Sequence, residues 1–289
     1  MKRLLSACMV AVLAAPAAAQ DAAFQLAREL LSEGNRELAA VEFRRLALTT
    51  ELQEERAAAY LFAGFAYLRT DDRTLAQDML DRAETADRSS RYACEHALLS
   101  AERARADRAP DQALYFYDVL AESCGSDIGS QVFARRRAAG LHLSTGDLDA
   151  ARRELEQSPV DEERGLRALE DYAGGTDKNP ALGAFLGLFP GAGYWYSGEV
   201  ANGFRSLLLN SLFIFGMIDT ADEEQWGAFA IISFFELTWY TGSIYGGVDA
   251  AHRYNRRRLE SARDAIHGDL SYRPDLDVTV PVFRLSIRF

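Results

Sequence analysis

A short pattern recurs four times between residues 20 and 160, and each copy is a polar turn followed by an apolar stripe at helical spacing. One small residue takes the same place in every copy, at intervals of 37, 37 and 38 residues. Two antiparallel helices approach closely only where a side chain is small, and alanine also has the highest helix propensity. A period of this length is typical of a solenoid of helical hairpins. We therefore predict an all-α fold class with a helical repeat domain over residues 20–175, marked by Ala39, Ala76, Ala113 and Ala151.

Residues 1–19 have the composition of an export signal. Two basic residues are followed by an apolar run from Leu4 to Leu13 and by small residues that end at Ala19. This order is typical of a secretory signal peptide, which we expect to be cleaved after Ala19. The alternatives are an uncleaved anchor and lipidation at Cys8.

Residues 22–160 resemble the tetratricopeptide repeat family. The matching segments are "GFAYLRTDDRTLAQDMLDRA" (64–83) and "TGDLDAARREL" (145–155), which correspond to the turn and the second helix of that family. The interval is a few residues above the family's ~34, and the proline after the second helix is mostly missing, so an unrelated helical bundle is the alternative. The resemblance implies a concave groove that binds protein partners and no catalysis. The family's packing positions correspond to Gly64, Tyr67, Ala76, Leu80 and Ala83.

Two cysteines, Cys94 and Cys124, remain after the predicted cleavage. With the repeats aligned on the recurring alanines, Cys94 begins the first helix of the third repeat and Cys124 follows the second helix. The two helices of such a hairpin run antiparallel, so both cysteines lie at the same end of it. We expect a disulfide, which export permits. Two separately buried thiols are the alternative.

Charge and motif content exclude several classes of activity. The chain has 43 acidic and 32 basic residues, a net charge of −11, which argues against a nucleic-acid partner. Its four histidines occur in no metal-binding spacing, and C-x-x-C, G-x-x-x-x-G-K-[ST] and G-x-S-x-G are all absent from the sequence. We therefore expect no enzyme activity, no catalytic residue, no cofactor and no metal.

The chain changes character after the glycine-rich linker at 174–179, because three apolar stretches with few charges follow. We predict a membrane domain over residues 176–258, with helices at about 180–196, 203–218 and 226–248. The last stretch has 23 residues and would extend about 35 Å as a helix, which is enough to span a bilayer, whereas the other two are shorter.

The charged flanks of these stretches predict their orientation. Residues 219–225 are acidic, and residues 252–263 contain five arginines, which favour the cytoplasmic side of a membrane. Three crossings after an exported repeat domain would place these arginines in the cytoplasm, whereas two crossings would place them outside. We therefore expect three crossings, with a monotopic or re-entrant first stretch as the alternative.

The segment "PGAGYWYSGEVANG" (190–203) combines glycines, aromatic residues and a proline between two apolar stretches. Proline bends or ends a helix, glycine permits a tight turn, and tyrosine and tryptophan prefer the membrane interface. We predict an interfacial elbow between two close-packed membrane helices, with a lipid or substrate site as the alternative. The elbow residues are Pro190, Gly191, Gly193, Tyr196, Gly198 and Gly203.

Glycines also recur four residues apart within the apolar stretches. Gly183 and Gly187 have this spacing in the first stretch, and Gly242 and Gly246 have it in the third. Small residues at this spacing let membrane helices pack closely. We expect the two stretches to pack on each other, or on a second copy of the chain in a homo-oligomer.

Residues 178–258 resemble a group of largely uncharacterised bacterial membrane domains with the elbow Pro-Gly-x-Gly-x-x-Tyr-x-Gly. The segment "YGGVDAAHRYNRR" (245–257) is similar to the end of these domains. The region is also similar to a two-helix membrane domain family with a Gly-x-x-x-Phe-Tyr-x-Gly turn. Neither resemblance implies a reaction.

Three polar residues, Arg205, Asn210 and Glu236, lie within the predicted membrane helices. An ionisable side chain inside a bilayer is costly and is often functional. We expect Glu236 to pair with Arg205 or Asn210 as a clamp between helices. A proton or ion pathway is the alternative.

Residues 259–289 form the predicted tail. Its end, residues 277–289, alternates apolar and polar side chains like a β-strand, which would add to the edge of a partner's sheet.

Together these features favour a membrane-anchored scaffold of a bacterial cell envelope. We expect the repeat domain to be periplasmic and to bind protein partners, and the anchor to contact membrane lipid, in the inner rather than the outer membrane. The alternative function is an accessory subunit of a membrane transport or protein-insertion system.

Overall fold

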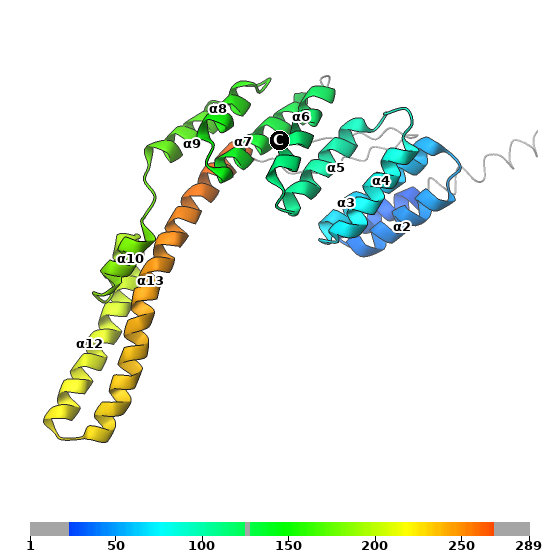
Figure 1. Cartoon of the computed structure of the whole chain (residues 1–289). Coiled ribbons are helices and arrows are strands. Elements are labelled where there is room, and N and C mark those ends of the chain that lie inside the picture. Colours follow the sequence, from blue (N-terminus) through cyan, green and yellow to red (C-terminus); the bar gives the residue numbers. More distant parts are fainter. Residues whose placement is uncertain (1–22, 125–127, 269–289) are drawn as a thin grey trace, which may run out of the picture. The chain divides into compact units, whose positions relative to one another are not determined.

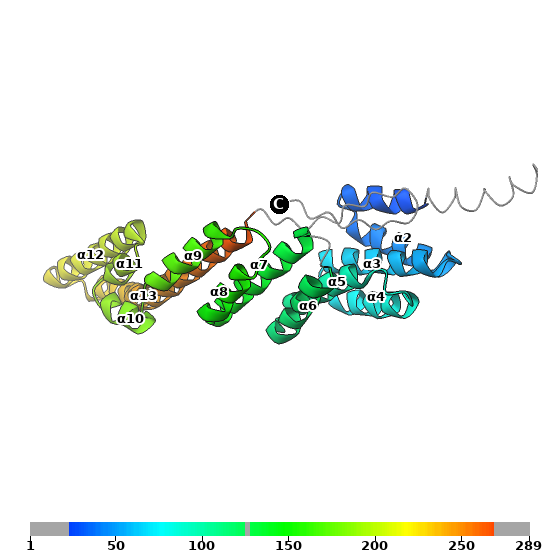
Figure 2. The same cartoon turned by 90° about the horizontal axis from the view of Figure 1, so that it is seen from above.

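The computed structural model describes residues 23–124 and 128–268, and all regular secondary structure in this part of the chain is helical (Figures 1 and 2). The all-α prediction is therefore confirmed for the described residues. The predicted signal peptide (1–19) and terminal strand (277–289) lie outside them. The described chain divides into two compact units, and the second is Arg164–Ile266. This boundary comes before the predicted one at residue 175, so most of the last helix assigned to the repeat domain belongs to the second unit.

The first unit is a succession of helices joined by short turns (Figure 1). Neighbours in the chain pack on each other in order, which is a repeat-like arrangement. After a helix at residues 23–32, the unit contains α2 (Arg36–Thr49), α3 (Gln53–Arg69), α4 (Arg73–Ala86), α5 (Ala93–Ala106), α6 (Pro110–Ser123), α7 (Ile128–Thr145) and α8 (Leu148–Glu156).

The recurring alanines lie at the contacts between these helices. All four have no exposed surface. A larger side chain at these positions would separate the paired helices, because protein interiors are closely packed. The structure thus confirms the small-residue positions inferred from the interval of 37 to 38: Ala39, Ala76, Ala113 and Ala151.

The backbone repeats with the same interval. Five residues before each recurring alanine, one residue adopts a left-handed conformation, which reverses the chain between two helices. The side chain of Asp72 or Asp147 then accepts a hydrogen bond from a backbone amide in the first turn of α4 or α8. The left-handed residues are Gly34 (φ 88°), Asp71 (φ 62°), Arg108 (φ 58°) and Gly146 (φ 86°).

Two apolar clusters form the core of the first unit. In the first, Phe43 stacks on Phe62 with ring centroids 4.8 Å apart, and Phe24 meets both rings edge-on. In the second, the ring of Tyr117 packs edge-on against Phe133. These clusters bury the apolar stripes that the sequence shows on the helices.

The second unit contains α10 (Pro180–Gly187), α11 (Ala192–Tyr196), α12 (Val200–Asp222) and nearly all of α9 (Glu163–Gly174) and α13 (Trp226–His267). α12 and α13 run side by side as an antiparallel hairpin with a short connection (Figure 1), and the short helices α10 and α11 lie at its base.

The observed helices differ from the predicted ones in three places. The stretch predicted as one helix over 180–196 is two short helices, because Gly191 adopts a left-handed conformation (φ 90°) just after Pro190. The helix predicted at 203–218 extends in both directions, to Val200 and Asp222. The helix predicted at 226–248 continues to His267 and so includes residues assigned to the tail.

Candidate functional site: a glycine-packed hairpin with a polar collar

The base of the hairpin is packed backbone against backbone through glycines. A Cβ atom on Gly183 would lie 2.5 Å from the carbonyl oxygen of Gly247, and one on Gly193 would lie 2.8 Å from the Gly247 Cα. A Cβ on Gly187 would lie 2.8 Å from the Cα of Ile244. Real side chains do not tolerate these distances to backbone atoms, so α10 and α11 approach α13 only because these residues are glycines.

The glycines of α13 differ from each other in their surroundings. Gly246 lies against the hydroxyl of Tyr194, whereas a Cβ on Gly242 would meet nothing within 4 Å. Gly242 therefore has no close neighbour within the described chain, and its packing on a second copy stays a prediction. The four-residue spacing missed Gly247, which directly follows Gly246 in the sequence and meets the backbone of Gly183 and Gly193.

The elbow residues connect α11 to α12. Gly191 and Gly203 meet backbone to backbone, and the Trp195 indole lies directly over Gly203. The backbone amide of Asn179 donates a hydrogen bond to the Tyr196 hydroxyl at 2.9 Å. Gly198 adopts a left-handed conformation (φ 77°) in the turn before α12.

A polar collar surrounds the base of the hairpin, and we define it as residues 177–179 and 199 together with 253–258 of α13. The Asn255 side chain bonds to both backbone groups of Lys178, accepting from its amide at 2.7 Å and donating to its carbonyl at 2.9 Å. Arg258 pairs with Asp177 and donates to the Tyr172 carbonyl at 2.7 Å. These contacts fix the chain entering α10 to the part of α13 that follows its apolar stretch.

Glu199 is the most strongly held acid of the collar. Arg253 donates to both of its carboxylate oxygens at 2.8 Å, and Asn202 donates a further hydrogen bond at 2.8 Å. The hydrogen bonds from Arg253 are the main cause that lowers the pKa of Glu199 from its ordinary 4.5 to about 2, against the opposing effect of burial. A bidentate guanidinium–carboxylate pair of this kind fixes the elbow to α13.

The contacts of the collar favour two crossings over the three that the charge bias predicts. That topology places residues 174–179 and the arginines after 252 on opposite sides of the membrane, whereas the structure joins Lys178 to Asn255 and Asp177 to Arg258. With 8 and 5 residues, α10 and α11 are about 12 and 8 Å long, too short to cross a ~30 Å hydrocarbon layer. The distribution of charged residues alone could not predict these contacts, because an orientation inferred from charge depends on an assumed number of crossings.

A seam of buried polar groups runs between α12 and α13. The hydroxyls of Ser206 and Ser243 are 2.9 Å apart, and the Asn210 side chain donates to the Ser206 carbonyl at 2.6 Å. Glu236 is also buried, and its Oε2 atom has no hydrogen-bond partner among the described residues. The predicted clamp from Glu236 to Arg205 or Asn210 is thus not formed. Arg205 is exposed and donates to Asn202 at 3.3 Å.

The hairpin exposes an apolar surface along much of its length. Most of the exposed large hydrophobic residues of the described chain belong to the second unit. α12 is long and apolar enough to cross a membrane, and it is the sole described helix with that combination. α13 lacks it because hydroxyl groups and Glu236 interrupt its apolar stretch. Examples of the exposed residues are Leu208, Leu212, Phe215, Phe234, Phe235 and Leu237.

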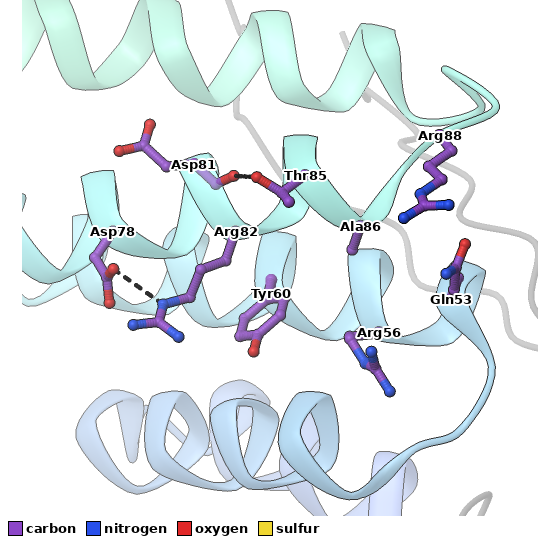
Figure 3. A pocket seen from close by; sticks show the side chains of 9 residues that line it. All are labelled: Gln53, Arg56, Tyr60, Asp78, Asp81, Arg82, Thr85, Ala86 and Arg88. Carbon is purple, nitrogen blue, oxygen red and sulfur yellow. Dashed lines mark hydrogen bonds and ion pairs between the residues drawn. The ribbon is translucent and has the colours of Figure 1, made fainter.

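The first unit holds the cysteine pair and two surface cavities. The Cys94 and Cys124 sulfur atoms lie 2.08 Å apart, at bonding distance, with Cα atoms 5.8 Å apart. A cavity of about 470 Å³ lies over α3 and α4 (Figure 3). Two of its three arginines are already engaged, since Arg82 pairs with Asp78 at 2.9 Å and Arg56 donates to the Thr50 carbonyl.

The second cavity, also about 470 Å³, is a groove lined by four successive helices, α3 to α6. Its apolar lining includes Leu61, Phe116 and Val119, and the exposed ring of Tyr115 stands at its edge. Acidic residues of α4 and of the following turn, Asp81, Glu84 and Asp87, form part of its wall. The groove therefore combines an apolar surface with negative charge.

Within the described ranges, no cluster of three or more metal-ligating side chains occurs. Comparisons with protein-family models, with curated proteins and with solved structures found no match to this chain. The three family resemblances therefore stay predictions, and function has to be argued from the residues themselves.

Proposed function

We propose that the protein is a membrane-anchored scaffold of a bacterial cell envelope. Its tetratricopeptide-like first unit binds protein partners, and its second unit holds the protein in the lipid bilayer. The observation that carries the proposal is the contrast between the two units, since the first buries its apolar residues and the second exposes them.

The anchor is argued from exposure. A soluble protein rarely leaves a continuous apolar patch in water, whereas a membrane helix directs such side chains to lipid. In the apolar 18-residue stretch of α12, only 17% is buried. The Ser206 hydroxyl instead bonds to the Ser243 hydroxyl of α13, and the buried Asn210 side chain donates to the Ser206 carbonyl of its own helix. This distribution, apolar outside and polar between the helices, suits a hairpin surrounded by hydrocarbon.

The proposed topology is a hairpin of two crossings. α12 and the apolar part of α13 cross the membrane, and α10 and α11 lie at the interface together with the collar. No membrane-length apolar helix lies between the described repeats and the collar in the chain, so both share one side of the membrane. The bonded cysteines favour an oxidising compartment, and we place this side in the periplasm.

The partner surface is the groove that crosses α3 to α6. An apolar floor gives affinity, and the acidic wall favours a segment that carries basic and apolar side chains. Tyr115 is the anchor residue of this surface, because its ring is 63% exposed and aromatic residues contribute much of the energy of protein interfaces.

The test is in-cell crosslinking of the full-length protein. We expect Tyr115→Ala to reduce partner crosslinks about tenfold, which corresponds to roughly 1.4 kcal/mol. Leu48→Ala is the matched control, because Leu48 is equally exposed at 63% and does not line the groove. Equal crosslinking in both variants would contradict the proposal that the partner binds in the groove. Full-length protein that is released from membranes by carbonate would contradict the anchor.

A second candidate function is supported by the seam in the hairpin. Glu236 Oε2 and Asn210 Oδ1 are buried and have no hydrogen-bond partner among the described residues, which is costly unless something else contacts them. An accessory subunit of a transport or protein-insertion system would place a polar group of another subunit there. In that case the second unit alone would keep the cellular phenotype, whereas a scaffold needs the first unit.

A further inference from the structure

A cleft of about 650 Å³ lies within the second unit, beside the base of the hairpin. Three segments line it, namely α9, the turn between α11 and α12, and the basic part of α13. Arg257 and Arg258 bring positive charge to the cleft, and Tyr172, Tyr254 and Ser261 bring hydroxyl groups. Guanidinium and hydroxyl donors converging on one space are the groups that bind phosphate oxygens.

One residue that lines the cleft carries a buried hydroxyl without a partner among the described residues. Ser197 is 1% exposed, and its Oγ atom has no hydrogen-bond partner among the described residues. A buried hydroxyl in this condition costs free energy, and native proteins usually satisfy it with a partner. An oxygen atom of a ligand in the cleft would provide that partner.

The charges around the cleft leave one arginine available. Arg258 is engaged by Asp177 and by the carbonyl of Tyr172. Glu199 accepts from the Nε and Nη2 atoms of Arg253 at 2.8 Å, whereas its contact with Arg257 is longer, at 3.6 Å. The Arg257 side chain is 60% exposed.

One acid, Asp171, also lines the cleft, and it is exposed. It limits the positive charge to a small excess, which favours a ligand with one or two negative charges over a polyanion.

The position of the cleft indicates which ligand it meets. Val200, an exposed apolar residue at the start of α12, follows Ser197 by only three positions, and exposed Phe204 comes one turn later. The cleft is therefore at the boundary between the apolar surface of the hairpin and its polar collar. In a bilayer this level corresponds to the phospholipid headgroups.

We propose that the cleft binds the phosphate of an anionic membrane phospholipid, with Arg257 and the Ser197 hydroxyl as its donors. The inference rests on the proposed membrane anchoring of the second unit and adds a specific lipid site to it. It also gives a role to arginines that the hairpin topology places outside the cytoplasm, where positive charge is not favoured by insertion.

The test uses full-length protein in neutral detergent, titrated by calorimetry with dihexanoyl phosphatidylglycerol. Dihexanoyl phosphatidylcholine and inorganic phosphate are the comparison ligands. We expect phosphatidylglycerol to bind at least tenfold more tightly than either. Equal binding of inorganic phosphate would show a free-anion site, and equal binding of phosphatidylcholine would show mere apolar adsorption. Either result overturns the proposal.

The variants separate a specific site from general attraction. Arg257→Gln and Ser197→Ala should each weaken phosphatidylglycerol binding, about tenfold for the arginine. Arg256→Gln is the matched control, because Arg256 is the adjacent exposed arginine and does not line the cleft. An equal loss with Arg256→Gln would mean diffuse charge and would overturn the site. If all proteins stay in carbonate-washed membranes but none prefers phosphatidylglycerol, the lipid site fails and the anchor stands.

Discussion

At the scale of single residues, the bidentate pair of Glu199 and Arg253 makes a pH-dependent prediction. The pKa of Glu199 is lowered to about 2 in the folded protein from an ordinary 4.5. Because the folded-state pKa is the lower one, the pair stabilises the protein fully above about pH 4.5, and this stabilisation is lost as the pH falls toward 2. We expect Glu199→Gln to cost about 2 kcal/mol near neutral pH.

Thermal unfolding in detergent from pH 7 to pH 2.5 measures the effect. The gap between wild type and Glu199→Gln should close as the pH falls below 4.5. Asp222→Asn is a control at the other end of α12, where the carboxylate is exposed, and its unfolding midpoint should stay close to that of wild type. A gap that stays constant down to pH 2.5 would show that the side chain acts through packing and not through its charge.

The residue scale also shows what a single sequence can reveal. The recurring alanines could be found because helix pairing requires a small side chain at one position in each repeat. Glu199 and Asn255 could not, because their partners are 54 and 77 residues away in the chain, and nothing in the local sequence records that distance. Arg108 likewise occupies a left-handed turn position where two other copies have glycine, so its residue type does not indicate the turn.

At the scale of elements, the contact of α10 and α11 with α13 predicts two opposite outcomes for glycine substitutions in one helix. A methyl group on Gly247 would collide with the backbone carbonyl of Gly183, which cannot move independently of α10. We expect Gly247→Ala to destabilise the hairpin by about 1–3 kcal/mol, as overpacking does. Gly242→Ala meets nothing within 4 Å, so it should leave stability unchanged or slightly raised, because alanine favours the helix.

Thermal unfolding of both variants in the same detergent tests this contact. Comparable destabilisation by the two substitutions would mean that Gly242 packs against something outside this chain, such as a second copy. That result would support the predicted homo-oligomer and would contradict the distinction drawn between the two glycines.

The ends of the helices show what the periodicity of apolar residues does not predict. The apolar run at 180–196 looks like one helix, and only the backbone conformation of Gly191 divides it into α10 and α11. Pro190 predicts a bend at this place. The division into two helices that are too short to cross a bilayer depends on the tertiary contacts of the glycines, which the local sequence does not show. The sequence predicts the end of a membrane segment where the charged residues begin, whereas α13 continues through them to His267.

At the scale of the whole molecule, the division into a charged repeat unit and an apolar unit could be predicted from composition alone. The number of membrane crossings could not, since two and three crossings fit the same apolar stretches. The contacts of the collar favour two crossings. In the proposed hairpin, residue 176 and residue 256 are on one side of the membrane, because the neighbouring residues Asp177 and Arg258 form an ion pair.

This topology is testable by cysteine labelling in intact spheroplasts. Thr176→Cys, Arg256→Cys and Glu224→Cys are each made in a background where Cys8 is replaced by serine, and a membrane-impermeant maleimide is added. Cys94 and Cys124 do not react while they are bonded to each other.

A hairpin predicts labelling at 176 and 256 from outside and labelling at 224, in the α12–α13 turn, only after lysis. Three crossings predict instead that 176 and 224 label from outside and that 256 does not. Because only position 176 gives the same result in both arrangements, it serves as the internal standard, and the other two decide between them.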